Sequence, residues 1–245
     1  MLLDEKVGIV TGAASGMGRA ASMLFAEQGA RVVCADINLD GAREVAAHFG
    51  SSGMAHRLDL ADKNSCREVV SGAAKKFDRI DFVANFGGVW DGRNTAEIEE
   101  EHWNRVLDVN LKGTFLLCQA VAPVMIRQRY GRIVVIGSIA ARVGGEMGGP
   151  HYAASKGGVI SLARALARRL GPNNVTVNTI NPGPVESEMT ASWSEQAKST
   201  MAKMTPLGRI GQPVDIARVA LFLVSDLSGW MTGQSLDVNG GIYFS

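Results

Sequence analysis

A tyrosine and a lysine, Tyr152 and Lys156, stand four residues apart near the start of a long segment with helical patterning. Residues at this spacing lie on one face of a helix, one turn apart. A phenol with an ordinary pKa of about 10 is a weak base at neutral pH, and a neighbouring ammonium group lowers that pKa. The pair is therefore a candidate proton-transfer site. Such a pair alone is usually an ordinary surface contact, so its surroundings must decide.

Two further polar residues could complete such a site. Ser138 is expected to end a strand at the carboxyl edge of a sheet, where its hydroxyl could hold a substrate oxygen; a turn or helix-cap serine is the alternative. Asn110 lies inside the helical segment Trp103–Gln128, where asparagine is a mediocre helix former and Gly113 follows soon after. We expect a local break in that helix, which would free a backbone carbonyl.

A glycine-rich turn follows the first predicted strand and runs into a helix, with the sequence Thr11-Gly12-Ala13-Ala14-Ser15-Gly16-Met17-Gly18. Glycines allow positive φ and close backbone approach, and the amides at a helix N-terminus attract a pyrophosphate. The spacing departs from the usual dinucleotide fingerprint, and a plain tight turn would explain the glycines equally well on their own. Their position between a strand and a helix favours the dinucleotide interpretation.

Asp36 ends the second predicted strand, near the distance at which a carboxylate accepts hydrogen bonds from the adenosine ribose. Its charge would repel a 2′-phosphate, so the sequence predicts NAD in preference to NADP. Ile37 and Asn38 follow, and we expect no basic residue beside this position. An ordinary solvated loop aspartate is the alternative.

Short β-branched runs alternate with amphipathic helical patterns along the chain. This alternation predicts an α/β fold, Rossmann-type and doubly wound, whose parallel sheet carries helices on both faces. We find no linker or repeat, and expect a single domain over residues 1–245 with substrate loops near 142–150 and 184–206. The predicted strands are Val7–Thr11, Arg31–Ala35, Met54–Leu58, Ile80–Ala84, Arg132–Ile136, Val175–Ile180 and Ser235–Val238.

Composition narrows the classes of partner. Lysine and arginine together number 25 against 24 acidic residues, so there is no overall field that would attract nucleic acid or an anionic membrane. The cysteines Cys34, Cys66 and Cys118 show no disulfide or metal-ligand spacing and are expected to be buried free thiols. We expect a cytoplasmic protein with a small-molecule partner, no metal, and no membrane or nucleic-acid partner.

These motifs resemble the short-chain dehydrogenase/reductase family, from Lys6 to the C-terminus. Asn110, Ser138, Tyr152 and Lys156 match that family's catalytic tetrad, and Asn181-Pro182-Gly183 is similar to its segment near the nicotinamide. The resemblance implies a nicotinamide cofactor, and Asp36 favours NAD over NADP. The residues it implies for cofactor binding are Gly12, Ser15, Gly16, Met17, Gly18, Asp36, Ile37, Asp59, Leu60, Asn85, Gly87, Tyr152, Lys156, Pro182, Gly183, Val185 and Ser187.

The resemblance also implies a mechanism. Ser138 would hold the substrate oxygen, Tyr152 would exchange the proton, and hydride would pass directly to or from the nicotinamide. Lys156 would lower the Tyr152 pKa and bind the nicotinamide ribose, while Asn110 would support a water that links the site to solvent. Relatives in this family assemble through two long helices and the last strand, so the resemblance implies a homotetramer.

Two departures from the family pattern stand out. The chain has Ala84-Asn85-Phe86-Gly87 where the family usually shows two asparagines followed by alanine and glycine, so Phe86 is expected to crowd the site. Ser138 and Tyr152 are fourteen residues apart, one more than in many relatives. The loop before Tyr152 is therefore expected to have its own shape.

The substrate stays open between two kinds of relative. The sequence resembles 3-oxoacyl-carrier-protein reductases and NAD-linked cyclic-alcohol dehydrogenases. Arg129 and Arg132 could serve an acidic carrier protein, but Asn173 stands where a second cation is expected, so a free small substrate is preferred. A non-catalytic nucleotide-sensing or scaffolding protein is the alternative of another class, as is a lyase-type relative. Hypothetical pocket residues are Trp90, Glu146, Met147, His151, Met189 and Trp193.

Overall fold

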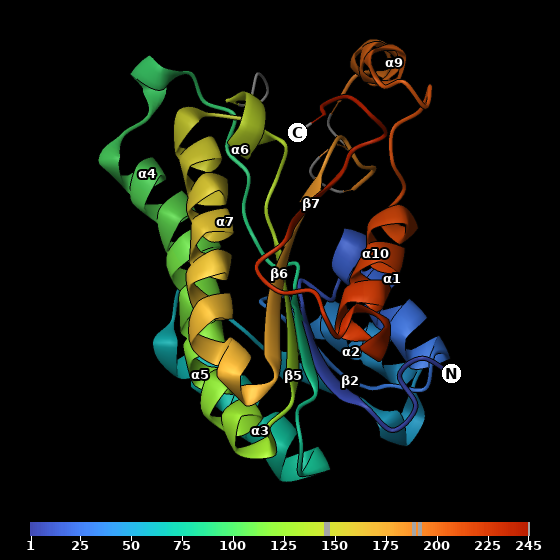
Figure 1. The fold of residues 1–245 in the computed structure, drawn as a ribbon. Helices are drawn as coiled ribbons and strands as arrows, with labels where there is room; N and C mark the ends of the chain where they lie inside the picture. Colours follow the sequence, from blue (N-terminus) through green and yellow to red (C-terminus); the bar gives the residue numbers. More distant parts are fainter. Residues whose placement is uncertain (145–147, 188–189, 191–192, 245) are drawn as a thin grey trace.

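The computed structural model of the chain describes residues 1–144, 148–187, 190 and 193–244 (Figure 1). A single seven-stranded parallel sheet runs through these residues in the order β3-β2-β1-β4-β5-β6-β7. Its strands are β1 Val7–Thr11, β2 Arg31–Asp36, β3 Gly53–Arg57, β4 Phe82–Asn85, β5 Gly131–Ile136, β6 Val175–Pro182 and β7 Ser235–Val238.

The strand order reverses between β1 and β4. From β1 the chain proceeds outward through β2 and β3, then returns to pair β4 on the other side of β1. Loops that leave the carboxyl ends of strands on either side of such a point diverge and leave a crevice for ligands. The predicted doubly wound fold is confirmed, and each predicted strand is present with ends that differ by at most two residues.

Helices cover both faces of the sheet (Figure 1). On one side lie α3, α4, α5 and α7, and on the other α1, α2 and α10. Their bounds are α1 Gly16–Glu27, α2 Leu39–Ala47, α3 Lys63–Phe77, α4 Glu100–Leu107, α5 Gly113–Gln128, α6 Ala140–Val143, α7 Pro150–Leu170, α9 Glu195–Met204 and α10 Pro213–Val224. A π-helical turn, η3 Asp108–Lys112, joins α4 to α5, and the 3-10 turns are η1 Gly50–Ser52, η2 Thr95–Glu97, η4 Gly171–Asn173 and η5 Asp226–Ser228.

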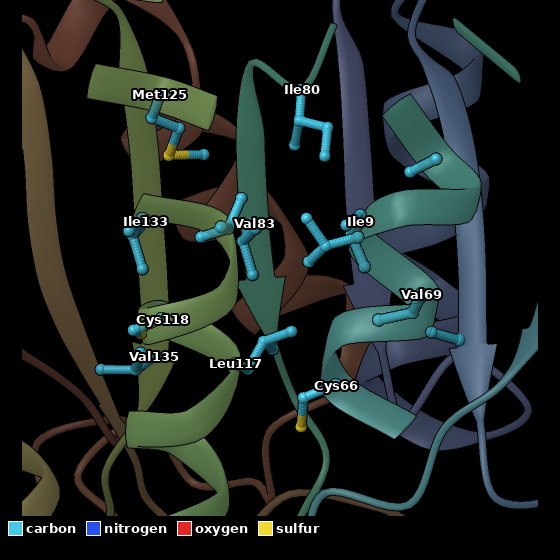
Figure 2. Close-up of a cluster of buried hydrophobic side chains, with 14 of the residues drawn as sticks. Ile9, Cys66, Val69, Ile80, Val83, Leu117, Cys118, Met125, Ile133 and Val135 are labelled. Carbon is cyan, nitrogen blue, oxygen red and sulfur yellow. The ribbon is translucent and has the colours of Figure 1, made fainter. Parts of the chain in front are cut away.

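Two buried apolar layers hold the helices to the sheet. The strands are buried on both faces, so their residues point alternately into the two layers. Figure 2 shows one layer, in which Ile9, Val83 and Ile133 from the strands meet Leu117 of α5 and Val69 of α3. Both layers lie along the strands, which leaves the loops at the carboxyl edge free to form a site.

The three cysteines are free and buried in these layers, as predicted. Burial raises the pKa of the Cys34 and Cys66 thiols to about 11 and that of Cys118 to about 12, because the ionised form is poorly solvated there. The thiols are therefore inert side chains of the core.

The continuous helix Glu100–Gln128 is long and apolar enough, by length and composition alone, to cross a membrane. In the structure it packs against α3 and α7. A core helix passes the same test, so the apolar stretch carries little weight as a sign of a membrane span.

Candidate active site

Ser138 and Tyr152 line one cavity of about 300 Å³ at the carboxyl edge of the sheet. Ser138 follows β5 directly, where it accepts a hydrogen bond from the Ala140 backbone N–H at 3.0 Å. Tyr152 stands in the first turn of α7, which begins at Pro150, a residue suited to a helix start because it lacks the N–H that the first turn leaves unpaired. A strand end and a helix start thus bring the two hydroxyl groups to the same space.

Lys156 lies one turn further along α7 and is buried. Its ammonium lies 5.8 Å from the centre of the Tyr152 ring and donates a hydrogen bond to the Ile136 carbonyl at 2.9 Å. A Cβ built on Gly88 would stand 3.0 Å from Asn110 Oδ1 and 3.5 Å from Lys156 Nζ, so this glycine lies directly against both side chains. Gly88 is a residue of the site that sequence reasoning missed, although it follows directly on the predicted Gly87.

Burial dominates the protonation of this pair. It raises the pKa of the Tyr152 phenol, and a hydrogen bond with the Ser138 side chain offsets part of that rise. It also lowers the pKa of the Lys156 ammonium to about 8. The net shift of the Tyr152 pKa is therefore upward, not the net fall expected from Lys156, because desolvation by burial is its largest cause.

Asn110 sits in the π-helical turn between α4 and α5, so the predicted irregularity in this helix is confirmed. Its side-chain amide accepts from the Val89 N–H at 2.8 Å and donates to the Val89 carbonyl at 2.9 Å and to Ser155 Oγ at 3.1 Å. Ser155 in turn donates to the Tyr152 carbonyl at 2.8 Å. Asn110 therefore ties the loop after β4 to the helix that carries Tyr152.

The backbone carbonyl of Asn110 is not free, because Thr114 Oγ1 donates to it at 2.6 Å. Thr114 also accepts from the Asn85 side chain at 2.9 Å, and Asn85 Oδ1 accepts from Thr11 Oγ1 at 2.5 Å. These buried side chains connect the end of β1 to the π-helical turn. The predicted cofactor role of Asn85 does not fit its side chain, which is 2% exposed and bonded within this network.

The glycine turn has the geometry of a phosphate cradle. Gly12 and Gly16 have φ of +64° and +51°, a region that side chains disfavour. A Cβ on Gly18 would stand 2.1 Å from the Gly12 carbonyl oxygen, so only glycine fits there. Ser15 precedes α1 without capping it through its side chain, which leaves the first-turn amides for an anion. The residues present thus fit a dinucleotide pyrophosphate.

Asp36 lies at the end of β2 and supports this turn. One carboxylate oxygen accepts from the Ala14 N–H at 3.0 Å and the other from the Asn38 N–H at 2.9 Å. Each carboxylate oxygen can accept a further bond, so ribose hydroxyls can still be held. Ile37 beside it is 61% exposed, as an adenine contact requires.

Arg57 corrects the expectation that no basic residue stands near Asp36. The two residues are paired in register on β2 and β3, and the Arg57 side chain is exposed. Side chains in register on parallel strands point to the same face. Sequence reasoning missed this cation because the pairing depends on the strand order, not on local spacing.

Asp59 and Leu60 follow β3 and shape the cofactor side of the crevice. Asp59 accepts from the Ala61 N–H at 3.0 Å, and a Cβ on Gly87 would stand 2.7 Å from a Leu60 methyl carbon. Gly87 also donates its N–H to Thr11 Oγ1 at 2.9 Å. These contacts place the glycine after β4 directly against the turn after β1.

The cavity takes its walls from both expected substrate loops and from the tail. Of the predicted cofactor residues, Tyr152 lines it together with Met17, Pro182, Gly183, Val185 and Ser187. Trp90 and Trp193 line it among the hypothetical pocket residues, whereas Glu146, Met147 and Met189 lie outside the described residues. Ile242 and Tyr243 from the tail also line it, and no local pattern could have predicted their return to this edge.

Two expectations about the walls are wrong. His151 is fully buried behind Tyr152, with its ring stacked on Trp103, and does not line the cavity. Adjacent residues on a helix point about 100° apart, which lets Tyr152 face the cavity while His151 faces the interior. Phe86 is buried in the apolar layer beneath α1 and α10 instead of crowding the site.

Comparison with known proteins gives one consistent result. Residues 12–243 match the family model described as enoyl-(acyl carrier protein) reductase. The chain is 40% identical to a 3-oxoacyl-[acyl-carrier-protein] reductase of Thermotoga maritima, over 99% of both chains. It is 37% identical to an NAD-dependent glycerol dehydrogenase of Listeria innocua, over 98% of this chain and 94% of that one.

Comparison with solved structures points to the same family as the sequence matches. The crystal structure of a short-chain dehydrogenase/reductase of Brucella melitensis superposes with a TM-score of 0.93 at 32% identity, over 100% of this chain and 99% of that one. With the sheet order and the glycine turn, these matches establish that the chain belongs to the short-chain dehydrogenase/reductase family of oxidoreductases.

Proposed function

We propose that this oxidoreductase interconverts a secondary alcohol and a ketone with NAD(H), using Tyr152 as the proton-transfer acid and base. One observation carries the proposal: Ser138 and Tyr152 face a single cavity, with Lys156 buried beneath Tyr152. A hydrogen-bond donor and a phenol at one point suit a single substrate oxygen.

Different residues of the chain would bind different parts of the cofactor. When bound, the nicotinamide cofactor supplies the hydride donor or acceptor. Gly12, Gly16 and Gly18 with the first turn of α1 would hold the pyrophosphate, and Asp36 the adenosine ribose. Asp59, Leu60 and Gly87 would form the cofactor side of the crevice, and Pro182, Gly183, Val185 and Ser187 would lie beside the nicotinamide.

The Ser138 hydroxyl donates a hydrogen bond to the substrate oxygen. The Tyr152 phenol gives that oxygen a proton during ketone reduction and takes one from it during alcohol oxidation. Because burial keeps the phenol protonated in this arrangement, reduction starts from the form already present. Lys156 supplies positive charge below a pH of about 8, which lowers the cost of forming the phenolate.

NAD is proposed over NADP on the charge of Asp36, whose carboxylate stands where a ribose 2′-phosphate would approach. Arg57 argues in the opposite direction, so the two residues are tested together. We expect Asp36→Asn to lower the ratio of kcat/KM for NADH over NADPH by about tenfold, since one charge repulsion is removed. Arg57→Gln should weaken NADPH use and leave NADH use unchanged. An Asp36→Asn ratio equal to that of the parent would refute the argument.

A carrier-protein-linked 3-oxoacyl reductase is the second candidate, favoured by the 40% identity to the Thermotoga maritima enzyme. The structure weakens one support for it. Arg132 is 4% exposed, pairs with Asp226 at 3.4 Å and stacks over the Tyr130 ring, so it cannot receive an acidic partner. Of the two expected cations only Arg129 is exposed, and Asn173 is neutral.

Assembly and location are also proposals. A homotetramer is supported by apolar side chains left partly open on α4 and α5, where Trp103, Phe115 and Ile126 are each 38–40% exposed. Sedimentation of a monomer at micromolar concentration would overturn it. A cytoplasmic location and a small-molecule substrate, without nucleic acid or membrane, fit the balanced charge and the buried free thiols.

Cofactor oxidation with a ketone panel tests the function. NADH and NADPH are first titrated by fluorescence, and their absorbance is then followed with ketones and 3-oxoacyl thioesters. Turnover of a free ketone with NADH supports the proposal, and preferential turnover of carrier-protein thioesters favours the second candidate. Cofactor binding without turnover across the panel would favour a nucleotide-sensing protein.

A further inference from the structure

The cavity wall has a chemical character that the proposed reaction does not require. Among the described residues that line it, none is an aspartate, glutamate, lysine, arginine or histidine. Burial of an unpaired carboxylate or phosphate in such surroundings costs several kcal/mol even after relaxation. The described part of the wall therefore offers no charged side chain to a substrate that carries a charge near its reacting oxygen.

The body of the cavity is apolar and partly aromatic. Away from Ser138 and Tyr152, its surface comes largely from Ile139, Val143, Met201, Met204 and Ile242, with Trp90 and Trp193. Thr190 Oγ1, which also faces it, is already bonded to backbone groups of residues 185 and 187. Thioether and indole surfaces favour flat or compact hydrocarbon, and Ser187 and Tyr243 are the further hydroxyl side chains among the described residues that line the cavity.

The space left for substrate is small. Ligand cavities range from about 300 to 1,000 Å³, and this one lies at the lower end. Residues proposed for the cofactor side, such as Met17, Gly183 and Val185, line the same cavity, so the nicotinamide ring takes part of the volume. What remains suits a body of about one ring.

The backbone beside Trp90 is held by contacts of the next residue, Asp91. Asp91 accepts from the Gly149 N–H at 2.8 Å, and its carboxylate lies 3.6 Å from His151 Nε2. The same carboxylate accepts from the Arg93 N–H at 3.0 Å and pairs with the Arg93 guanidinium. A Cβ on Gly148 would stand 3.5 Å from Trp90 Nε1 and 2.8 Å from a Tyr152 ring carbon. The indole and the phenol therefore both lie against the backbone at Gly148.

From these observations we infer that the substrate is an uncharged ketone or secondary alcohol of about one ring in size, whose carbon body packs against Trp90. This inference rests on the proposed function and narrows it. It disfavours hydroxy acids, sugar phosphates and polyols, including glycerol, the substrate in the name of one relative.

The test uses two matched pairs of ketones with the full-length protein and NADH. Ethyl acetoacetate and acetoacetate share the reacting ketone and differ in the charge and the ethyl group of the carboxyl end, and cyclohexanone and dihydroxyacetone differ in size and polarity. We expect kcat/KM to be at least about 100-fold higher for the ester than for the acid, and at least about tenfold higher for cyclohexanone than for dihydroxyacetone. Equal or reversed values in either pair would overturn the inference.

A charge placed in the wall gives a second readout. Trp90→Arg should lower the ratio of kcat/KM for ethyl acetoacetate to kcat/KM for acetoacetate by about tenfold or more. The acid gains a charged partner, and the ester loses the apolar wall. Ser51→Arg adds the same charge at an exposed position in η1, after α2, and should leave the ratio unchanged. A Trp90→Arg ratio equal to that of Ser51→Arg would show that Trp90 does not contact substrate.

Failure of the proposed function would look different. If no ketone is reduced although NADH binds, the acid/base mechanism fails, while calorimetry on the NADH complex still ranks binding of cyclohexanone against acetoacetate. Preferential binding of cyclohexanone then supports the inferred pocket chemistry, and preferential binding of acetoacetate overturns it.

Discussion

Replacement of the buried lysine tests the balance between stability and activity. A fall in the pKa of Lys156 from 10.5 to about 8 corresponds to about 3 kcal/mol of unfavourable free energy for the charged form in the folded state. Lys156→Met keeps the length of the side chain, removes this charge and loses the hydrogen bond to Ile136. With about 1 kcal/mol allowed for that bond, we expect the variant to be about 2 kcal/mol more stable at pH 7 and inactive.

The pH dependence of stability follows from the difference in proton binding by Lys156 between the folded and unfolded chains. Below pH 8 the lysine is charged in both folded and unfolded chains, so its whole cost is present; between about 8 and 10.5 only the unfolded chain holds the proton. This lysine should therefore make the parent gain stability as the pH rises through that window. The gain should be absent in Lys156→Met.

Urea unfolding at pH 7, 8.5 and 10, at one protein concentration, measures both effects. Gln is a polar control: Lys156→Gln should be less stable than Lys156→Met because it buries an amide. A Lys156→Met variant that is less stable than the parent at pH 7, with the same pH dependence, would refute the desolvation argument.

Three further changes follow from contacts in the structure. Gly18→Ala should abolish NADH binding, because its Cβ would stand 2.1 Å from the Gly12 carbonyl oxygen, whereas Gly171→Ala, with nothing within 4 Å, is the matched control in a fluorescence titration. Asp36→Asn should shift cofactor choice toward NADPH by about tenfold in kcat/KM, and unchanged choice would count against the carboxylate. Asp91→Asn should raise the KM for cyclohexanone about fivefold with kcat nearly unchanged, since about 1 kcal/mol of support for the Trp90 loop is lost. A matching fall in kcat would instead place Asp91 in the chemistry.

The parts of the fold that depend on local sequence were predictable. The strands follow from β-branched runs, and the phosphate cradle from glycines placed between a strand and a helix. The irregular helix at Asn110 was also predictable, because asparagine and a nearby glycine both weaken a helix. Each of these depends on neighbours within a few residues.

What failed depends on residues far apart in the chain. The protonation of Tyr152 and Lys156 is set by burial under several elements, which the helix spacing alone does not report. Arg57 stands in register beside Asp36 only because β3 pairs with β2. Phe86 is buried because its side chain points into the layer under α10, and this depends on the face that the chain presents after β4.

The proposed mechanism depends on proton exchange between Tyr152 and the substrate oxygen. The most direct measurement is kcat/KM for the best ketone in Tyr152→Phe, alongside NADH affinity, since phenylalanine keeps the ring and removes only the hydroxyl. We expect activity to fall about 1,000-fold while NADH binds as in the parent. A variant that reduces the ketone as fast as the parent would contradict this mechanism.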